Sequence, residues 1–145
     1  MYLQELRIKL SQGDIFNQID LIDSAAPTAP PKTHNVIVLS HSCEIEKPSN
    51  SIVLVCAIRP LSQVDLGQRG HIQGNRIFNA MYLEPIGTLP ESFIDFRYIF
   101  RVNKMFLEEG TRQGLKIASL NDETQLALTT FFYRFLARRI PSVNR

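Results

Sequence analysis

Short runs of apolar residues, many of them β-branched or aromatic, recur along the chain and predict β-strands. The runs comprise residues 14–22, 35–40, 51–58, 76–86 and 93–103. The runs at 35–40 and 51–58 are apolar on both faces, which is typical of central strands. We therefore expect these two strands to lie in the middle of a sheet.

Residues 93–103 alternate between apolar and charged side chains. Apolar residues occupy one parity, and most of the other parity is charged: Ile94, Phe96, Tyr98 and Phe100 against Asp95, Arg97, Ile99 and Arg101. Successive side chains of a strand point to opposite faces, so this pattern predicts a half-buried strand with a charged outer face. Tyr98 is then expected to point into the core.

One helix is predicted at the C-terminal end of the chain, from about residue 121 to 139. Asn121 is a good N-cap, and the acidic residues that follow it suit a helix N-terminus. An apolar stripe at helical spacing then follows, and basic residues precede a proline that stops the helix: Leu128, Phe131, Phe132, Phe135 and Leu136, then Arg138, Arg139 and Pro141. Aromatic residues at this spacing indicate a core-packing face.

The segments between the strands carry turn-forming residues. Residues 24–32 are proline-rich, residues 42–50 contain Ser, Pro, Asn and Glu, and residues 61–75 are polar with several glycines. The first and last segments predict loops, and the middle one predicts a hairpin or a short crossing loop. Helices do not alternate with strands, so the predicted fold is mainly β: a small antiparallel sheet or barrel with a C-terminal α-helix packed on it.

The composition fits a single domain that spans residues 1–145. The chain has 145 residues, of which 44% are hydrophobic and 21% charged, as in ordinary globular domains. It has no apolar run long enough to span a membrane, and its N-terminal segment lacks the apolar core of a signal peptide. We therefore expect a cytoplasmic protein without a membrane partner, whose two cysteines are free thiols.

The net charge of +2 is too small to indicate a nucleic-acid partner. Basic residues nevertheless cluster in residues 97–116 and on the predicted helix, where the simplest interpretation is a solvated face. A nucleic-acid surface needs basic residues and stacking aromatics. Arg97 and Arg101 share one side of their predicted strand and are candidates for binding, whereas Tyr98 is expected on the other side.

The stretch VIVLSHSCEIEKPSN, residues 36–50, brings a histidine and a cysteine to the end of a predicted strand. His41 and Cys43 have the same parity, so their side chains can meet on one face. They are candidates for a binding site, or for a thiol site in which Cys43 is the nucleophile and His41 or His71 is the base. A core face is the favoured interpretation, because a free cysteine is commonly buried. The spacing with Glu44 and Glu46 suits no zinc motif, so we expect no metal and no cofactor.

Four segments together resemble the MazF/PemK family of bacterial toxins, also called plasmid-maintenance toxins or cell-growth inhibitors. They are Gly13-Asp14-Ile15, Val36–Ser40, Ser51–Ser62 and Ser119–Leu128. The resemblance spans residues 13 to about 138. It implies an SH3-like antiparallel β-barrel with a C-terminal helix. It also implies a metal-independent endoribonuclease that acts on single-stranded RNA, forms a homodimer and is neutralised by an antitoxin.

The chain departs from the family pattern at both catalytic positions. Active members carry an Arg-Pro pair before the second strand, where this chain has His34-Asn35. They carry a Thr or Ser after the third strand, where this chain has Arg59, and Ser62 is the nearest hydroxyl beyond it. The candidate catalytic set is therefore His34 as base or acid, Arg59 as phosphate ligand and Ser62 as an auxiliary hydroxyl.

Two interpretations of function remain open at this stage. The first is a diverged endoribonuclease, active or inactive. The second is a non-enzymatic protein-interaction module of a mobile element or phage-defence system. The second interpretation is consistent with residues 40–45, SHSCEI, which resemble a Ser-x-x-Cys-(Asp/Glu)-Ile pattern of uncharacterised bacterial and phage-borne proteins. In that case residues 40–45 and 61–75 would bind a protein partner.

Overall fold

The computed structural model describes residues 1–22 and 28–139, without the side chain of Arg139. Six β-strands lie within these residues: β1 (Asp14–Leu21), β2 (Lys32–Val38), β3 (Ile52–Pro60), β4 (Ala80–Leu83), β5 (Ser92–Asn103) and β6 (Lys116–Ser119). The helices of this part of the chain are α1 (Ser42–Glu46), α2 (Leu66–Gln73), α3 (Lys104–Arg112), α4 (Asp122–Arg139) and a 3-10 turn at Leu61–Gln63. Residues 24–27 of the predicted proline-rich loop, and Pro141, lie outside the described residues.

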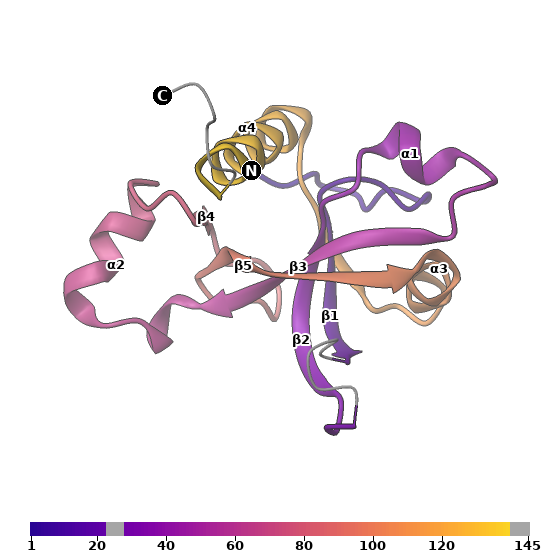
Figure 1. Ribbon diagram of the computed structural model, residues 1–145, viewed down its shortest axis with the longest axis horizontal. Helices are drawn as coiled ribbons and strands as arrows, with labels where there is room; N and C mark the ends of the chain where they lie inside the picture. Colours follow the sequence, from indigo (N-terminus) through magenta and orange to yellow (C-terminus); the bar gives the residue numbers. More distant parts are fainter. Residues whose placement is uncertain (23–27, 140–145) are drawn as a thin grey trace.

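The strands form one antiparallel sheet in the order β4-β5-β3-β2-β1-β6. β4 and β6 are its edges, so the hydrogen bonds of the described residues leave the sheet open. The sheet is strongly twisted: β3 and β5 run across the view in Figure 1, whereas β1 and β2 run down it. A mainly β fold with a C-terminal helix is thus confirmed, and the SH3-like barrel stays a prediction.

Helix α4 covers one face of the sheet. Asn121 caps it as expected, because its Oδ1 accepts a hydrogen bond from the backbone N–H of Thr124 at 2.9 Å. Its apolar stripe packs on the sheet, where Phe96 stacks on Phe132 and Phe135 at centroid distances of 6.0 and 5.8 Å. Among the described residues, no helix is long and apolar enough to cross a membrane.

The opposite face of the sheet is only partly covered. Alternate residues of β2 and β3 form a second core with Leu107 of α3: Val36, Val38, Val53 and Val55. His34 continues the parity of Val36 along β2, and Arg59 continues the parity of Val55 along β3. Since α3 does not reach that end of the strands, this face becomes accessible where His34 and Arg59 lie.

Two helices replace loops that the polar composition predicted. Residues 61–75 form the 3-10 turn and α2, in which Ile72 is the buried anchor. Residues 42–46 form α1, so the predicted hairpin or crossing loop at 42–50 begins with a helix. Helix α3 and strand β6 were not predicted, although Asn103 is a standard N-cap: its Oδ1 accepts from the N–H of Met105 at 2.9 Å.

Candidate functional site

His34 and Arg59, the two leading candidates from the sequence, lie side by side. Asn35 pairs with Ile58 across β2 and β3, and the same antiparallel register places His34 opposite Arg59. Both side chains line a hollow of about 620 Å³, which also reaches Tyr98 of β5. The structure therefore brings together residues that are far apart in sequence.

A second hollow of about 550 Å³ adjoins the first, because Lys32, His34 and Tyr98 line both. It adds Arg97 and Arg101, the two basic residues expected on the outer face of β5. We call the two hollows together the His34 groove. The charged residues that line it are all basic within the described part of the chain: Lys32, Arg59, Arg97 and Arg101. Such a lining favours an anionic ligand.

A large β-bulge in β5 shapes this groove. Cys56 pairs with Ile99 and Ile58 pairs with Ile94, so β5 advances five residues while β3 advances two. The surplus residues of β5 break the strict alternation of faces. Bulges re-aim side chains in this way and are common beside active sites.

The bulge overturns two expectations for β5. Asp95 was expected on the charged outer face, but it is buried. Tyr98 was expected in the core, but its side chain is 46% exposed and lies in the groove. Asp95 and Tyr98 are therefore site residues that strand periodicity misplaced.

Asp95 holds two arginines at the groove. Its Oδ1 accepts from Arg97 Nε at 3.0 Å, and its Oδ2 accepts from Arg97 Nη2 at 2.9 Å and from Arg59 Nη1 at 3.3 Å. The hydrogen bonds from Arg97 to Asp95 raise the pKa of Arg97, which stays charged. One buried carboxylate thus fixes two guanidinium groups that β3 and β5 supply.

Both of these guanidinium groups lie near the ring of Tyr98. The Cζ of Arg59 lies 5.9 Å from the centre of the Tyr98 ring, and the Cζ of Arg97 lies 5.6 Å from it. Both distances are within the range of cation–π attraction. The result is an exposed aromatic ring beside two positive charges, both of which pair with Asp95.

The surroundings of His34 in the groove change its pKa. Its pKa is lowered from the usual value, chiefly by burial and then by the positive charges of Lys32 and Arg59. Its ring also lies 5.5 Å from that of Phe100. A neutral imidazole at neutral pH is the form that accepts a proton, so the surroundings suit His34 to act as a base.

The backbone beside His34 carries a second irregularity. Ile19 pairs with His34 and Phe16 with Val36, so β1 contains an extra residue at this point. Gln18 adopts a positive φ of 51°, and its N–H donates to Asn35 Oδ1 at 3.0 Å. A non-glycine residue rarely takes this conformation, and such strain is concentrated at functional sites. Gln18 also lines the groove.

Ser62, the third catalytic candidate, lies in the 3-10 turn after β3 and is exposed. Its carbonyl oxygen accepts from Arg69 Nη2 at 3.0 Å. The lining residue from this turn is Gln63 rather than Ser62. The auxiliary role of Ser62 therefore stays a prediction without a contact that supports it.

His41 and Cys43 lie apart from the groove, at the start of α1. The expectation that these two residues extend a strand is wrong. His41 caps helix α1, and its Nδ1 accepts a hydrogen bond from the N–H of Cys43 at 3.1 Å. Cys43 is a free, exposed thiol, so the favoured core interpretation is also wrong for it, whereas Cys56 is free and buried. Within the described ranges, no cluster of three or more His, Cys, Asp or Glu side chains is placed to hold a metal ion.

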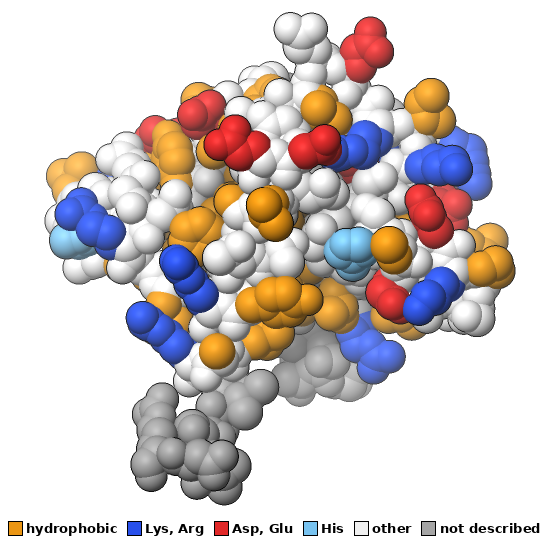
Figure 2. Space-filling view, turned by 90° about the horizontal axis from the view of Figure 1, so that it is seen from above, with side chains coloured by type: hydrophobic (Ala, Val, Ile, Leu, Met, Phe, Trp, Pro, Cys, Tyr) orange, Lys and Arg blue, Asp and Glu red, His pale blue; other side chains and the backbone are white. Residues whose placement is uncertain are grey.

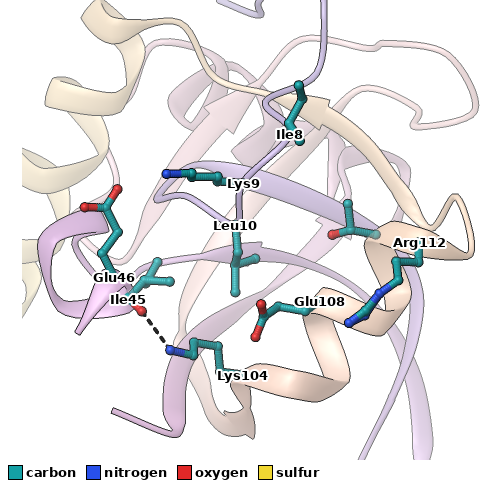
Figure 3. Close-up of a pocket in the computed structure, with 9 residues that line it drawn as sticks. Ile8, Lys9, Leu10, Ile45, Glu46, Lys104, Glu108 and Arg112 are labelled. Atoms are coloured by element: carbon teal, nitrogen blue, oxygen red, sulfur yellow. Dashed lines mark hydrogen bonds between the residues drawn. The ribbon is translucent and has the colours of Figure 1, made fainter. Parts of the chain in front are cut away.

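A larger hollow of about 680 Å³ lies between the N-terminal segment, α1 and α3 (Figure 3). Lys104 spans it and donates from Nζ to the carbonyl oxygen of Ile45 at 3.0 Å. Charges of both signs line it: Lys9, Lys104 and Arg112 with Glu46 and Glu108. Because charges of both signs line it, it is a weaker candidate for an anion site than the His34 groove.

Three features make the His34 groove the leading candidate for the functional site. It has a histidine with a lowered pKa, four basic side chains and an exposed aromatic ring. Comparison with family models and with curated proteins finds no match to this chain, so the MazF/PemK resemblance stays a prediction.

Proposed function

We propose that this protein is a divergent, MazF/PemK-like endoribonuclease that binds single-stranded RNA in the His34 groove and cleaves it without a metal ion. The observation that carries the proposal is the juxtaposition of His34 and Arg59 beside the exposed ring of Tyr98. Single-stranded nucleic acid is bound by basic grooves with aromatic stacking surfaces. The groove supplies both, together with a base for chemistry.

The chemistry assigns one role to each group. Neutral His34 takes the proton of a ribose 2′-hydroxyl, and the 2′-oxygen then attacks the adjacent phosphorus. The bond to the 5′-oxygen breaks, which leaves a 2′,3′-cyclic phosphate and a 5′-hydroxyl. Arg59 binds the phosphate and stabilises the added negative charge.

The leaving 5′-oxygen needs a proton. Among the described residues that line the groove, His34 is the sole histidine and none is acidic. We therefore assign this proton to water. An acid that is not positioned contributes little to the rate, so slow turnover is expected.

Base stacking completes the substrate model. A nucleobase on Tyr98 would place its own phosphate near Arg97 or Arg59, because both guanidinium groups lie close to the ring. Pairing with Asp95 leaves these arginines fixed in position, which reduces the entropy lost when they bind a phosphate. The proposal also includes the partners that the resemblance implies: a second copy of the chain, and an antitoxin that covers this groove in the cytoplasm.

One assay tests the enzymatic proposal. Wild type, His34→Ala and Arg59→Ala are incubated with a mixed single-stranded RNA in EDTA, with His71→Ala and Arg112→Ala as matched controls outside the groove. We expect cleavage by wild type and by both controls, and a loss of about 100-fold or more in the groove variants, which is the usual contribution of a positioned base. Absence of cleavage by wild type would overturn the enzymatic role, and equal cleavage by all five proteins would overturn the site.

The second candidate is a protein-interaction module without catalysis. It is favoured by the exposure of His41 and Cys43 on α1 and by Leu66 on α2, whose side chain is 78% exposed. If wild type neither binds nor cleaves RNA, a pull-down with Leu66→Ser and Cys43→Ser variants becomes the relevant test. Loss of a partner in these variants, but not in His34→Ala, would establish this role.

A further inference from the structure

A second basic hollow lies between α4 and the connection from α2 to β4. Its volume is about 360 Å³, and three arginines line it: Arg76, Arg134 and Arg138. None of the described residues that line it is acidic. Figure 2, which looks onto the side of α4, shows basic side chains beside hydrophobic ones on this face.

The arginines of this hollow are held in place by aromatic rings and by the backbone. The Cζ of Arg138 lies 5.0 Å from the centre of the Phe78 ring, and the Cζ of Arg134 lies 5.8 Å from that of Phe131. Arg76 donates from Nη2 to the carbonyl oxygen of Gly70 at 3.2 Å. The guanidinium groups are thus partly ordered before any ligand arrives, which lowers the entropic cost of binding.

The described residues supply no ion-pair partner to these arginines. Among the described residues, the ion pairs of the chain involve other side chains, and none includes Arg76, Arg134 or Arg138. The helix C-terminus itself accounts for some preference for basic residues on α4. It does not account for Arg76, which another segment brings to the same hollow.

We infer that this hollow, the Arg134 site, is a second contact for the sugar–phosphate backbone of a single-stranded RNA, an inference that rests on the proposed function of the His34 groove. Arginine binds phosphate oxygens through a planar fork of donors. Phe78, 40% exposed and stacked on Phe135 at 6.2 Å, offers a ring on which a base can rest.

The test measures binding separately from cleavage. A fluorescent 2′-O-methyl oligouridylate is used, because it lacks the 2′-hydroxyl that His34 would activate. The double variant Arg134→Ala/Arg138→Ala is compared with Lys47→Ala/Arg112→Ala, which removes two exposed basic side chains that pair with glutamates elsewhere. Fluorescence anisotropy is recorded as a function of salt, and circular dichroism verifies that each variant is folded.

The expected result is specific to the Arg134 site. The logarithm of the binding constant falls linearly with the logarithm of the salt concentration. Loss of two phosphate contacts should make this slope shallower by about 1.4, since each contact on a single strand contributes about 0.7. Affinity at low salt should fall about tenfold or more, and Arg134→Lys/Arg138→Lys should recover part of the loss because it keeps the charge. The control double variant should change the slope by less than half as much.

Two outcomes would overturn the inference. One is an Arg134→Ala/Arg138→Ala variant that behaves like the control. The other is a polyglutamate of matched charge that competes for the site as well as the oligonucleotide does, which would assign the hollow to an acidic protein partner. Failure of the proposed function has a different signature: Tyr98→Ala would then leave binding unchanged, while the effect of the Arg134 site persists.

Discussion

Two buried aspartates, Asp14 and Asp95, both pair with basic side chains, but the partners differ in their exposure to solvent. Asp14 is 0% exposed and pairs with Lys116, which is 1% exposed, at 2.9 Å. Asp95 is 1% exposed, but its partners Arg59 and Arg97 are 36% and 50% exposed. One site buries both charges, and the other buries only the anion.

The Asp14 site is closed by its other contacts. Lys116 Nζ also donates to the carbonyl oxygens of Arg7 at 2.8 Å and Lys9 at 3.2 Å. Asp14 accepts from the hydroxyl of Ser119 at 2.7 Å and from the N–H of Ser11 at 2.8 Å. These bonds fasten the N-terminal segment to β1 and β6, and no group is left for a ligand.

The difference indicates what each carboxylate does. A charge pair with both members buried and satisfied fixes local structure. A buried carboxylate under two accessible arginines instead fixes the position of cations that face the groove. The first arrangement serves the fold, and the second prepares a surface that binds anions.

The largest expected effect comes from breaking the closed pair. Lys116→Met should lower the free energy of unfolding by about 3–5 kcal/mol, because it leaves the Asp14 carboxylate buried without its cation. Urea denaturation measures this loss. Lys47→Met, which breaks an exposed pair with Glu44, is the control and should change stability little. An equally small effect of Lys116→Met would contradict the closed-site interpretation.

Asp95→Asn tests the open site and should have a smaller effect on stability. We expect the free energy of unfolding to fall by about 1–3 kcal/mol, because the substitution weakens buried hydrogen bonds of Asp95 while both arginines stay hydrated. RNA cleavage at saturation should fall by about 10- to 100-fold, because misplaced groups lose catalytic geometry.

The direction of the Asp95→Asn effect distinguishes two explanations. The substitution makes the groove more positive, so attraction of RNA by charge alone predicts tighter binding and no loss of rate. A positioning role predicts the loss. Glu109→Gln removes the same negative charge from an exposed pair on α3 and should leave cleavage unchanged.

Tyr98→Leu removes the aromatic ring beside Arg59 and Arg97. Stacking of a base on an aromatic side chain contributes about 1–3 kcal/mol, so RNA should bind about 5- to 100-fold more weakly. Tyr98→Phe should bind nearly as well as wild type, because the ring remains. Anisotropy titration measures both variants, and equal binding by Leu and Phe would show that no base rests there.

The two aspartates also show how far the sequence predicts this structure. Apolar periodicity located β1, β2, β3 and β5 and the stripe of α4, because these elements bury one or both faces regularly. His34 and Arg59 were found as candidates because the MazF/PemK resemblance matches them to that family's catalytic positions, at the ends of two strand runs. Asp95 and Tyr98 were misplaced, since alternation cannot show a bulge that depends on the pairing of β5 with β3.

Other differences have equally local causes. The short polar helices α1 and α2 carry few apolar residues, so composition predicted loops for them. Strand β6 was missed because it contributes four residues to a sheet edge. Lys32 was overlooked as a groove residue because it lies at the start of β2, beyond the apolar run.

The smallest expected effect is a pH dependence from His34. Its pKa in the folded protein is lowered, mainly by burial, so the unfolded chain binds the proton more readily as pH falls below about 6.5. The contribution of His34 to stability is therefore present above that pH and is lost as pH falls through the folded-state pKa. Urea denaturation between neutral and mildly acidic pH should show a shallower decline in unfolding free energy for His34→Gln than for wild type.

The cleavage rate of wild type should stay constant to below pH 6.5 before it falls, because His34 stays neutral there. A rate that already falls from neutral pH, along the titration of an ordinary histidine, would remove His34 from the role of base.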